Sequence, residues 1–279
     1  MINGWKCFSK QKLEFIGVPK PSLGTGTTLI TMAVILALLC LAPSVWSAES
    51  KEGEVPATQQ EVKVQASVLF NRGLTLEREG KWEEAIRVFQ EALGVEPHYG
   101  EACHHLGLAF VHLQQYPQAV EAFKETVRLQ PQWLAARENL GAALSKEGKW
   151  EEARAEFQEA VRLAPGRAEG HYLLGLALGK LGRHQEAMKA FAQAVKLQPD
   201  SVKAHNNLAM AYIKLDRWQD AANEFKQTIR LKQNDAEAHY GLCAYYVKVG
   251  DRDAAAKEYQ VLQRLDPKMA KKLADLLQK

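Results

Sequence analysis

The sequence contains none of the short motifs that usually mark a nucleotide-binding or hydrolytic enzyme. No G-x-x-x-x-G-K, G-x-G-x-x-G, G-x-S-x-G or H-E-x-x-H pattern occurs in its 279 residues. A regular repeat, described below, fills most of the chain and leaves no room for a separate catalytic domain. We therefore expect a protein that is not an enzyme and that has no cofactor.

Most of the chain also has no net charge. The formal net charge is +3 at pH 7. Four lysines and one glutamate within residues 1–28 account for all of it, which leaves 32 basic and 32 acidic residues in the remainder. Because binding to phosphates needs a basic patch or domain, we expect no nucleic-acid partner.

Cysteine is scarce, with four residues in the whole chain. Cys7 and Cys40 lie near the N-terminus, whereas Cys103 and Cys243 fall far apart in the repeated part. Their separation excludes a disulfide framework. We expect Cys103 and Cys243 to be buried as small apolar side chains.

One apolar stretch, residues 29–42, stands between a basic and an acidic flank. This charge order predicts that the part of the chain after this stretch is carried to the far side of the membrane. The stretch has the length of a signal-peptide core, and Ser47 or Ala48 could end a cleaved segment. An uncleaved anchor from Thr27 to Trp46 stays an alternative. We interpret residues 1–48 as a signal peptide or N-terminal membrane anchor, and residues 49–65 as a polar linker. Contact with a membrane is expected only through residues 29–46, if they are uncleaved.

The remainder of the chain repeats every 34 residues. Six units span residues 66–99, 100–133, 134–167, 168–201, 202–235 and 236–269. Position 8 of every unit is small, position 20 is alanine and position 24 is aromatic. Position 32 is proline in every unit except the fifth, which has Gln233. Such a period indicates a stacked array of short structural units.

These residues resemble the tetratricopeptide repeat family, whose motif the third unit carries almost completely. Its matching residues are Leu140, Gly141, Leu144, Ala153, Phe157, Ala160 and Pro165. The resemblance implies an all-α, right-handed superhelical solenoid of six helix-turn-helix repeats. It also implies a concave groove, formed by the first helix of each repeat, that binds a protein or an extended peptide.

Apolar spacing within each unit agrees with two helices. Leu174, Leu178 and Leu181 share one helical face, and Gly182 interrupts the helix. We expect the glycine at position 8 to let two helix backbones cross closely. After the last unit, residues 270–279 are predicted to form a capping helix.

Candidate partner-binding residues occupy positions 5, 6 and 13 of the repeats, which face the groove in this family. Lysine or arginine recurs at position 13, and asparagine recurs at position 6, where its amide could donate to and accept from a peptide backbone. Family consensus alone would also explain both rows. The candidates are Phe70, Asn71, Arg78, His104, His105, Asn139, Lys146, Tyr172, Lys180, Asn206, Asn207, Lys214, Tyr240 and Lys248.

The eight histidines do not form a convincing metal site. His171, His205 and His239 share position 4, where the family packs an aromatic side chain. His105 and His112 are two helical turns apart, about 10 Å along the axis. Because zinc needs four short bonds, we expect no metal.

The sequence therefore predicts a non-enzymatic interaction scaffold of the cell envelope. The repeats are expected outside the cytoplasm, either periplasmic or anchored to the membrane. An accessory subunit of an enzyme or maturation system, such as cytochrome biogenesis or glycan export, is the alternative.

Overall fold

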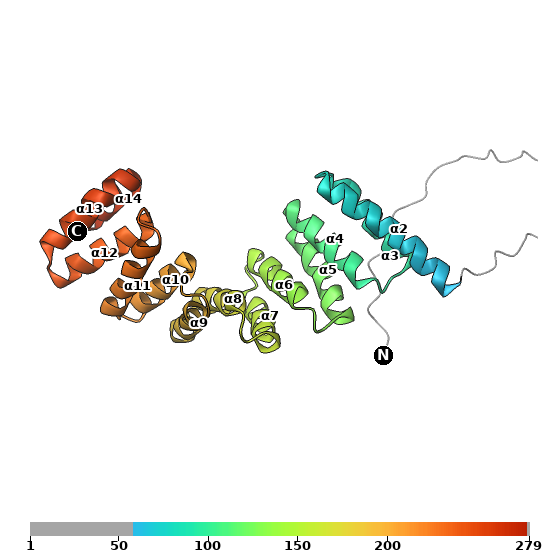
Figure 1. Cartoon of the computed structure of the whole chain (residues 1–279), viewed down its shortest axis with the longest axis horizontal. Helices are drawn as coiled ribbons and strands as arrows, with labels where there is room; N and C mark the ends of the chain where they lie inside the picture. Colours follow the sequence, from blue (N-terminus) through green and yellow to red (C-terminus); the bar gives the residue numbers. More distant parts are fainter. Residues whose placement is uncertain (1–57, 278–279) are drawn as a thin grey trace, which may run out of the picture. The chain divides into compact units, whose positions relative to one another are not determined.

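A computed structural model describes residues 58–277, and all of its regular elements in that range are α-helices (Figure 1). Numbered as in Figure 1, the helices alternate between the first and second members of the repeats. The first helices are α2 (Gln59–Arg78), α4 (Gly100–His112), α6 (Leu134–Lys146), α8 (Ala168–Lys180), α10 (Val202–Lys214) and α12 (Ala236–Val249). The second helices are α3 (Trp82–Val95), α5 (Tyr116–Leu129), α7 (Trp150–Leu163), α9 (His184–Leu197), α11 (Trp218–Leu231) and α13 (Arg252–Leu265), followed by α14 (Pro267–Leu277).

The observed helices follow the 34-residue period. Every second helix begins at position 17 of its repeat and ends at position 30, two residues before the recurring proline position. Consecutive helices pack against each other from α2 to α14. The expected all-α solenoid of stacked helix pairs is confirmed.

The turn within each repeat depends on one residue in the left-handed backbone region. This residue lies at position 15 in all six repeats: Gly80, Gln114, Gly148, Gly182, Asp216 and Gly250, with φ between 58° and 80°. Glycine adopts this conformation without steric cost, and it occupies four of the six positions. The turn residue predicted at Gly182 is therefore one member of a series.

Helix α2 begins earlier than the repeat pattern predicts. Residues 59–65, assigned above to the polar linker, form its first two turns. Thr58 and Glu61 make a reciprocal capping box, in which the Thr58 backbone N–H donates to Glu61 Oε2 over 2.7 Å. The capping box satisfies backbone groups at the helix start and so extends the helix beyond the repeat. Residues 59–65 of the predicted linker are therefore helical.

The recurring glycine at position 8 makes room for an aromatic ring rather than for a helix backbone. A Cβ atom on Gly141 would lie 2.5 Å from Phe157 Cε1, and one on Gly175 would lie 2.6 Å from Phe191 Cε1. Gly73 and Gly107 stand in the same relation to Phe89 and Phe123. The aromatic residue at position 24 thus fills the space that a side chain at position 8 would occupy. Our expectation of close backbone crossing is corrected accordingly.

Repeat five solves the same packing problem differently. Ala209 stands at position 8, and the ring of Phe225 instead lies against Gly241 of the next repeat. A Cβ atom on Gly241 would overlap that ring. Position 6, which holds Gly241, is larger in every other repeat. In repeat five, the glycine that makes room for the aromatic ring is therefore Gly241 of the next repeat, and position 8 carries Ala209.

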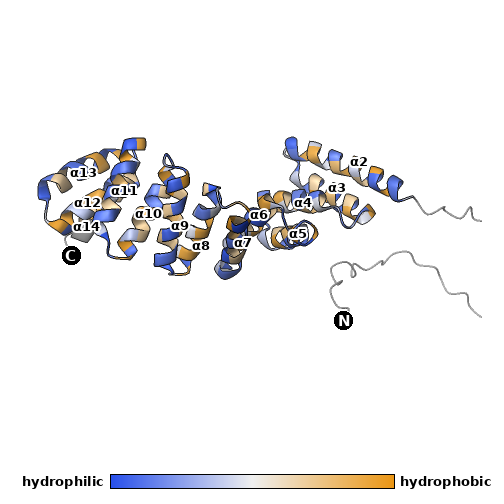
Figure 2. Cartoon of the chain, turned by 60° about the horizontal axis from the view of Figure 1, so that its bottom comes forward, coloured by the Kyte–Doolittle hydropathy of each residue, from blue (hydrophilic) through white to orange (hydrophobic). Residues whose placement is uncertain are grey.

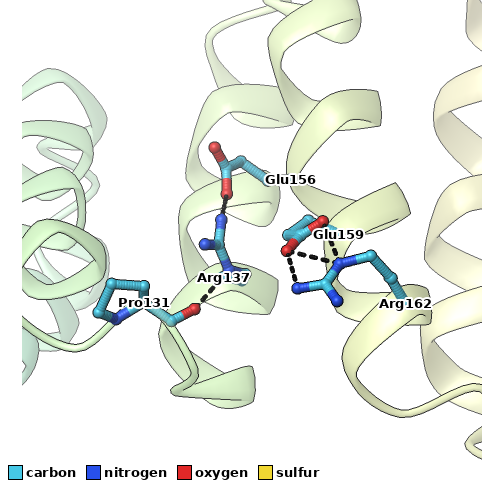
Figure 3. Close-up of polar contacts among 5 residues, drawn as sticks. All are labelled: Pro131, Arg137, Glu156, Glu159 and Arg162. Carbon is cyan, nitrogen blue, oxygen red and sulfur yellow. Dashed lines mark hydrogen bonds and ion pairs between the residues drawn. The ribbon is translucent and has the colours of Figure 1, made fainter.

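A tether at position 4 joins successive repeats. Arg137 donates from Nε to the Pro131 carbonyl over 2.9 Å and from Nη1 to Glu156 Oε2 over 2.8 Å (Figure 3). Pro131 belongs to repeat two, whereas Arg137 and Glu156 belong to repeat three. Figure 3 also shows the neighbouring Arg162–Glu159 pair, which lies within α7 and does not join repeats.

His205 and His239 form the corresponding tethers of repeats five and six. His205 Nδ1 lies 2.6 Å from Glu224 Oε2, and its Nε2 lies 2.9 Å from the Pro199 carbonyl. His239 makes the equivalent contacts with Glu258 and the Gln233 carbonyl. These histidines were expected to serve only as packing residues. They instead make polar bridges between repeats.

Helix α14 covers the end of the last repeat. It begins at Pro267, three residues before the predicted boundary, because Asp266 accepts from the Met269 N–H over 2.9 Å and caps the helix. Ala270 and Leu273 are buried in one cluster with Cys243 and Leu262. The helix thus shields apolar residues of repeat six.

Apolar and polar residues share every helix of the repeats (Figure 2). None of the helices within residues 58–277 is long and apolar enough to cross a membrane. The export or anchor segment predicted within residues 1–48 lies outside the described range.

Candidate functional site

The first helices of the six repeats form one continuous surface, which we call the first-helix face. Neighbouring members of this set contact each other directly, as α8 does with α6 and α10. All fourteen candidate residues lie on these helices. Their contacts separate the candidates into residues that join repeats and residues that remain open.

Most of the position 5 row makes contacts within the chain. Four of its six members contact the residue at position 34 of the same repeat, which lies just before the next first helix. Phe70 and Tyr99 have ring centroids 5.0 Å apart, and His104 lies 4.4 Å from Trp133 by the same measure. Further pairs are Glu138–Arg167 and Asn206–Asp235. These contacts use part of the row within the chain, and its role toward a partner stays a prediction.

His104 is a closely enclosed member of this row. Only 7% of the residue is exposed, and desolvation lowers the pKa of its imidazole to about 4. Its Nε2 atom lies 3.0 Å from Asn139 Nδ2 of the next repeat. His104 is therefore neutral at pH 7 and accepts a hydrogen bond from Asn139.

The asparagines at position 6 have their amide donors partly engaged. Asn139 donates to His104, and Asn207 donates to the Tyr172 hydroxyl and to the Lys203 carbonyl. Both residues thus bind the position 5 side chain of the preceding repeat. Asn71 is exposed in the first repeat, which has no repeat before it. Asn139 and Asn207 therefore keep their acceptor oxygens free of these contacts, while their amide nitrogens already have partners within the chain.

His105 also has a partner within the chain. Its Nδ1 atom lies 2.8 Å from Glu77 Oε2, across the joint between α2 and α4. The ring stands edge-on to Phe70, with centroids 5.4 Å apart. His105 therefore stabilises the stack of repeats one and two.

Three residues of the position 13 row contact a tryptophan at position 17 of the preceding repeat. Trp82 stacks on His112 with ring centroids 3.7 Å apart. Lys180 and Lys248 lie over Trp150 and Trp218, at 5.8 Å and 4.4 Å from the ring centroids. These cation–π contacts hold part of the basic row against the neighbouring repeat.

Lys248 differs from the other basic residues because it also makes an ion pair. Its Nζ atom lies 2.8 Å from Asp216 Oδ1. Arg78, Lys146, Lys180 and Lys214 are exposed and make no ion pair within residues 58–277. These four side chains keep their positive charge available to a partner.

A pocket of about 210 Å³ opens on the first-helix face between α8 and α10. Gly175 and Gly179 of α8 line it, together with Met210 of α10. The remaining lining residues are Leu176, Lys180, His184, Ala187, Phe191, Asn207, Ala211 and Lys214. We call this cavity the Gly179 pocket. Its lining is mostly apolar, and none of its residues is acidic.

Next to it lies a wider depression of about 930 Å³, lined by residues of repeats four, five and six. Asn207 lines both cavities. Asp200, Glu237 and Asp266 give this second depression an acidic character. Its two lysines are paired, Lys203 with Glu169 and Lys232 with Asp235. We call it the acidic bay.

The sequence had not singled out Gly179 or Met210. Position 12 carries Glu77, Val111, Ser145, Ile213 and Val247 in the other repeats, so that glycine is peculiar to repeat four. This departure from the repeat was the available signal. The candidates named above all come from positions that recur, which is why they do not include Gly179.

Among the described residues, no group of three histidine, cysteine, aspartate or glutamate side chains is placed to hold a metal ion. Cys103 and Cys243 are buried and unpaired, and burial raises the pKa of the Cys103 thiol to about 12. Cys103 is therefore protonated at pH 7 and has little nucleophilic character. The inert, small apolar role predicted for these cysteines agrees with their burial.

The fold and this face define an α-helical repeat solenoid with an open binding surface. Models of the tetratricopeptide repeat match residues 70–132, 104–168, 138–202 and 178–239, together more than half of the chain. The chain belongs to the tetratricopeptide repeat family. This family's fold is typical of scaffolds that bind other proteins.

Several solved structures are similar to this chain. MamA from Desulfovibrio magneticus RS-1, residues 41 to the end, is 29% identical; the match covers 61% of this chain and 96% of that one, with a TM-score of 0.58. PilF of Pseudomonas aeruginosa is 20% identical over 77% of this chain and 98% of that one, with a TM-score of 0.63. YrrB, described as a tetratricopeptide repeat protein with an unusual peptide-binding site, is 17% identical over 67% and 97% of the chains, with a TM-score of 0.59. No curated protein matches the sequence.

Proposed function

We propose that this protein is a non-catalytic scaffold whose first-helix face forms a concave groove for an acidic segment of a partner polypeptide. The observation that carries the proposal is the set of exposed, unpaired basic side chains on consecutive first helices, above all Lys146, Lys180 and Lys214. They occupy the same repeat position, so they line one side of the face. A row of like charges at regular spacing attracts a chain of opposite charge.

An extended peptide is the form of partner that suits this surface. The acceptor oxygens of Asn139 and Asn207 remain available to backbone N–H groups, whereas their donors are partly engaged. Backbone contacts of this kind bind many sequences, so the preference would be set mainly by charge. Solenoid proteins commonly use such an extended face for binding.

Fluorescence anisotropy with labelled peptides rich in aspartate and glutamate tests the proposal. The triple variant Lys146→Ala, Lys180→Ala and Lys214→Ala should bind more weakly, because each exposed charge contact contributes about 0.2–1 kcal/mol. Raising the salt concentration should weaken the wild type and leave the triple variant less affected. Glu83→Lys, on second helix α3, is the matched charge control and should not change the affinity.

If the triple variant binds normally and Glu83→Lys abolishes binding, the partner occupies the opposite face. The basic row would then be family consensus. Unchanged melting temperatures in both variants would show that neither result arises from unfolding.

We further propose that the repeats act outside the cytoplasm, in the cell envelope. The support is the apolar stretch at residues 29–42 with its basic flank before and acidic flank after. A reporter fused after Gly53 should be active only beyond the cytoplasmic membrane. Cytoplasmic activity of that fusion would contradict the proposed location.

A further inference from the structure

Gly179 has no packing reason to be glycine. A Cβ atom added there would meet no atom within 4 Å, and its backbone needs no left-handed conformation, since Gly179 is not among the residues with positive φ. Glycine inside a helix is less favourable than alanine by about 0.5–1 kcal/mol. The residue therefore weakens α8 slightly, and in exchange it leaves space on the first-helix face.

The space that Gly179 leaves is the pocket between α8 and α10. Met210 forms part of its wall and is 49% exposed, which is unusual for a large apolar side chain. The volume of about 210 Å³ is below the range of about 300–1,000 Å³ typical of small-molecule sites. The pocket therefore suits a single side chain better than a cofactor or metabolite.

The charge around the pocket limits what can enter it. Lys180 and Lys214 both line it, one from each helix, and neither makes an ion pair within residues 58–277. No acidic residue takes part in the lining. An apolar side chain with carboxylates beside it in the sequence would satisfy both the apolar wall and the two ammonium groups.

The neighbouring acidic bay adds a constraint. Asp200, Glu237 and Asp266 would repel acidic residues beyond Asn207. Lys146 of α6 lies on the other side, one repeat earlier. The acidic flank of a bound segment would therefore extend toward Lys146.

We propose that the Gly179 pocket receives one apolar side chain of the partner, flanked by aspartate or glutamate, and so fixes the position of the segment along the groove. This inference rests on the proposed function, because it names the anchor by which the acidic segment is held. It adds a specificity determinant that charge alone does not provide.

A set of labelled nine-residue peptides tests this proposal. Each has two acidic residues on one side of a varied centre and neutral residues on the other, in both sequence orders, and the centre is leucine, methionine, phenylalanine, serine or lysine. The wild type should prefer the apolar centres over serine by about tenfold. Gly179→Leu should abolish this preference, because the new side chain fills the pocket while the lysines remain.

Matched variants separate loss of the pocket from loss of the fold. Gly94 in α3 is also a helical glycine with no atom within 4 Å of an added Cβ, so Gly94→Leu is the control. Gly94→Leu should leave the preference intact. Gly179→Ala should reduce it by a smaller factor than Gly179→Leu, and neither Gly179 variant should lower the melting temperature.

The outcomes distinguish this inference from the proposed function. If acidic peptides bind the wild type but Gly179→Leu keeps the apolar preference, the groove stands and the anchor site is wrong. If peptides with apolar and serine centres bind equally, the anchor site is also wrong. If no acidic peptide binds the wild type, the proposed function fails and the anchor fails with it.

Discussion

Two glycines one turn apart on α8 have opposite surroundings. Gly175 lies against the ring of Phe191, and any side chain there would collide with it, whereas Gly179 faces open space. Glycine stands at position 8 in four of the six units, including Gly175, whereas position 12 is glycine in one unit, at Gly179. The recurring glycine belongs to the packing of the repeat. The solitary one marks a place where this chain departs from its own repeat.

The same contrast divides the whole first-helix face. Side chains at positions 5 and 6 hold the repeats together through contacts such as His104 with Asn139. Beside the Gly179 pocket, Lys180 and Lys214 are exposed and make no ion pair within residues 58–277, although Lys180 also lies over Trp150 of the preceding repeat. Residues that a repeat family places in a groove can thus make contacts within the chain. The surface available to a partner is then smaller than the family consensus implies.

The largest expected effect is on stability. Gly175→Leu should destabilise the protein by about 1–3 kcal/mol or more, because the new side chain overlaps Phe191. Gly141→Leu should behave alike against Phe157. Gly179→Leu should cause no such loss. Urea unfolding of the three variants measures the differences, and equal losses at Gly175 and Gly179 would remove the distinction between them.

The next effect concerns Gly241 and Ala209, which lie beside the Phe225 ring at the joint of repeats five and six. Gly241→Asn restores the side chain found at position 6 of repeats one, three and five, yet it should destabilise the protein, because the Phe225 ring occupies that space. Adding Ala209→Gly should recover part of the loss by letting the ring move back. A double-mutant cycle in urea measures this coupling. Simple additivity would show that the two positions are independent.

A pH dependence separates the His205 tether from the tether at Arg137. The Glu224 carboxylate, together with the Pro199 carbonyl, raises the pKa of His205 above its usual 6.5. The resulting stability is complete below about pH 6.5 and is lost as the pH rises through the folded-state pKa. Stability measured from pH 6 to 9 should therefore fall less in His205→Gln than in the wild type. Parallel profiles would show that this histidine is not charged in the fold.

The smallest expected effect is at an exposed basic residue. Lys146→Ala should change the free energy of unfolding by no more than about 0.5 kcal/mol, because Lys146 is exposed and makes no ion pair within residues 58–277. Its effect should appear instead in the affinity for acidic peptides. Thermal unfolding and anisotropy on one sample separate the two, and a large drop in melting temperature would place Lys146 among the residues that hold repeats together.

The fold was predictable because its signal recurs six times. Every second helix begins at the position that the period indicates, and the turn at Gly182 was visible in the sequence. The early start of α2 was less evident, since it depends on a capping box between Thr58 and Glu61 outside the repeat. A repeat pattern carries no information about residues beyond its first unit.

The site was predicted less well, because a position in a repeat does not reveal what a neighbouring repeat places beside it. Tyr172 and Asn207 were both correctly placed on the first-helix face, but their mutual contact depends on how two repeats stack. Lys248 was likewise one of the partner-binding candidates, and Asp216 of the preceding repeat pairs with it. Contacts between repeats decide which groove residues remain available.

Methionine methyl groups offer the most direct test of where a partner side chain binds. The chain has five methionines, and Met210 lines the Gly179 pocket, Met269 lines the acidic bay and Met188 is buried. With carbon-13 in the methionine methyls, an acidic peptide with a central leucine should shift the Met210 signal and leave Met188 and Met269 unchanged. A bound peptide that shifts Met269, or no methionine signal, would contradict the assignment of the Gly179 pocket as the anchor site.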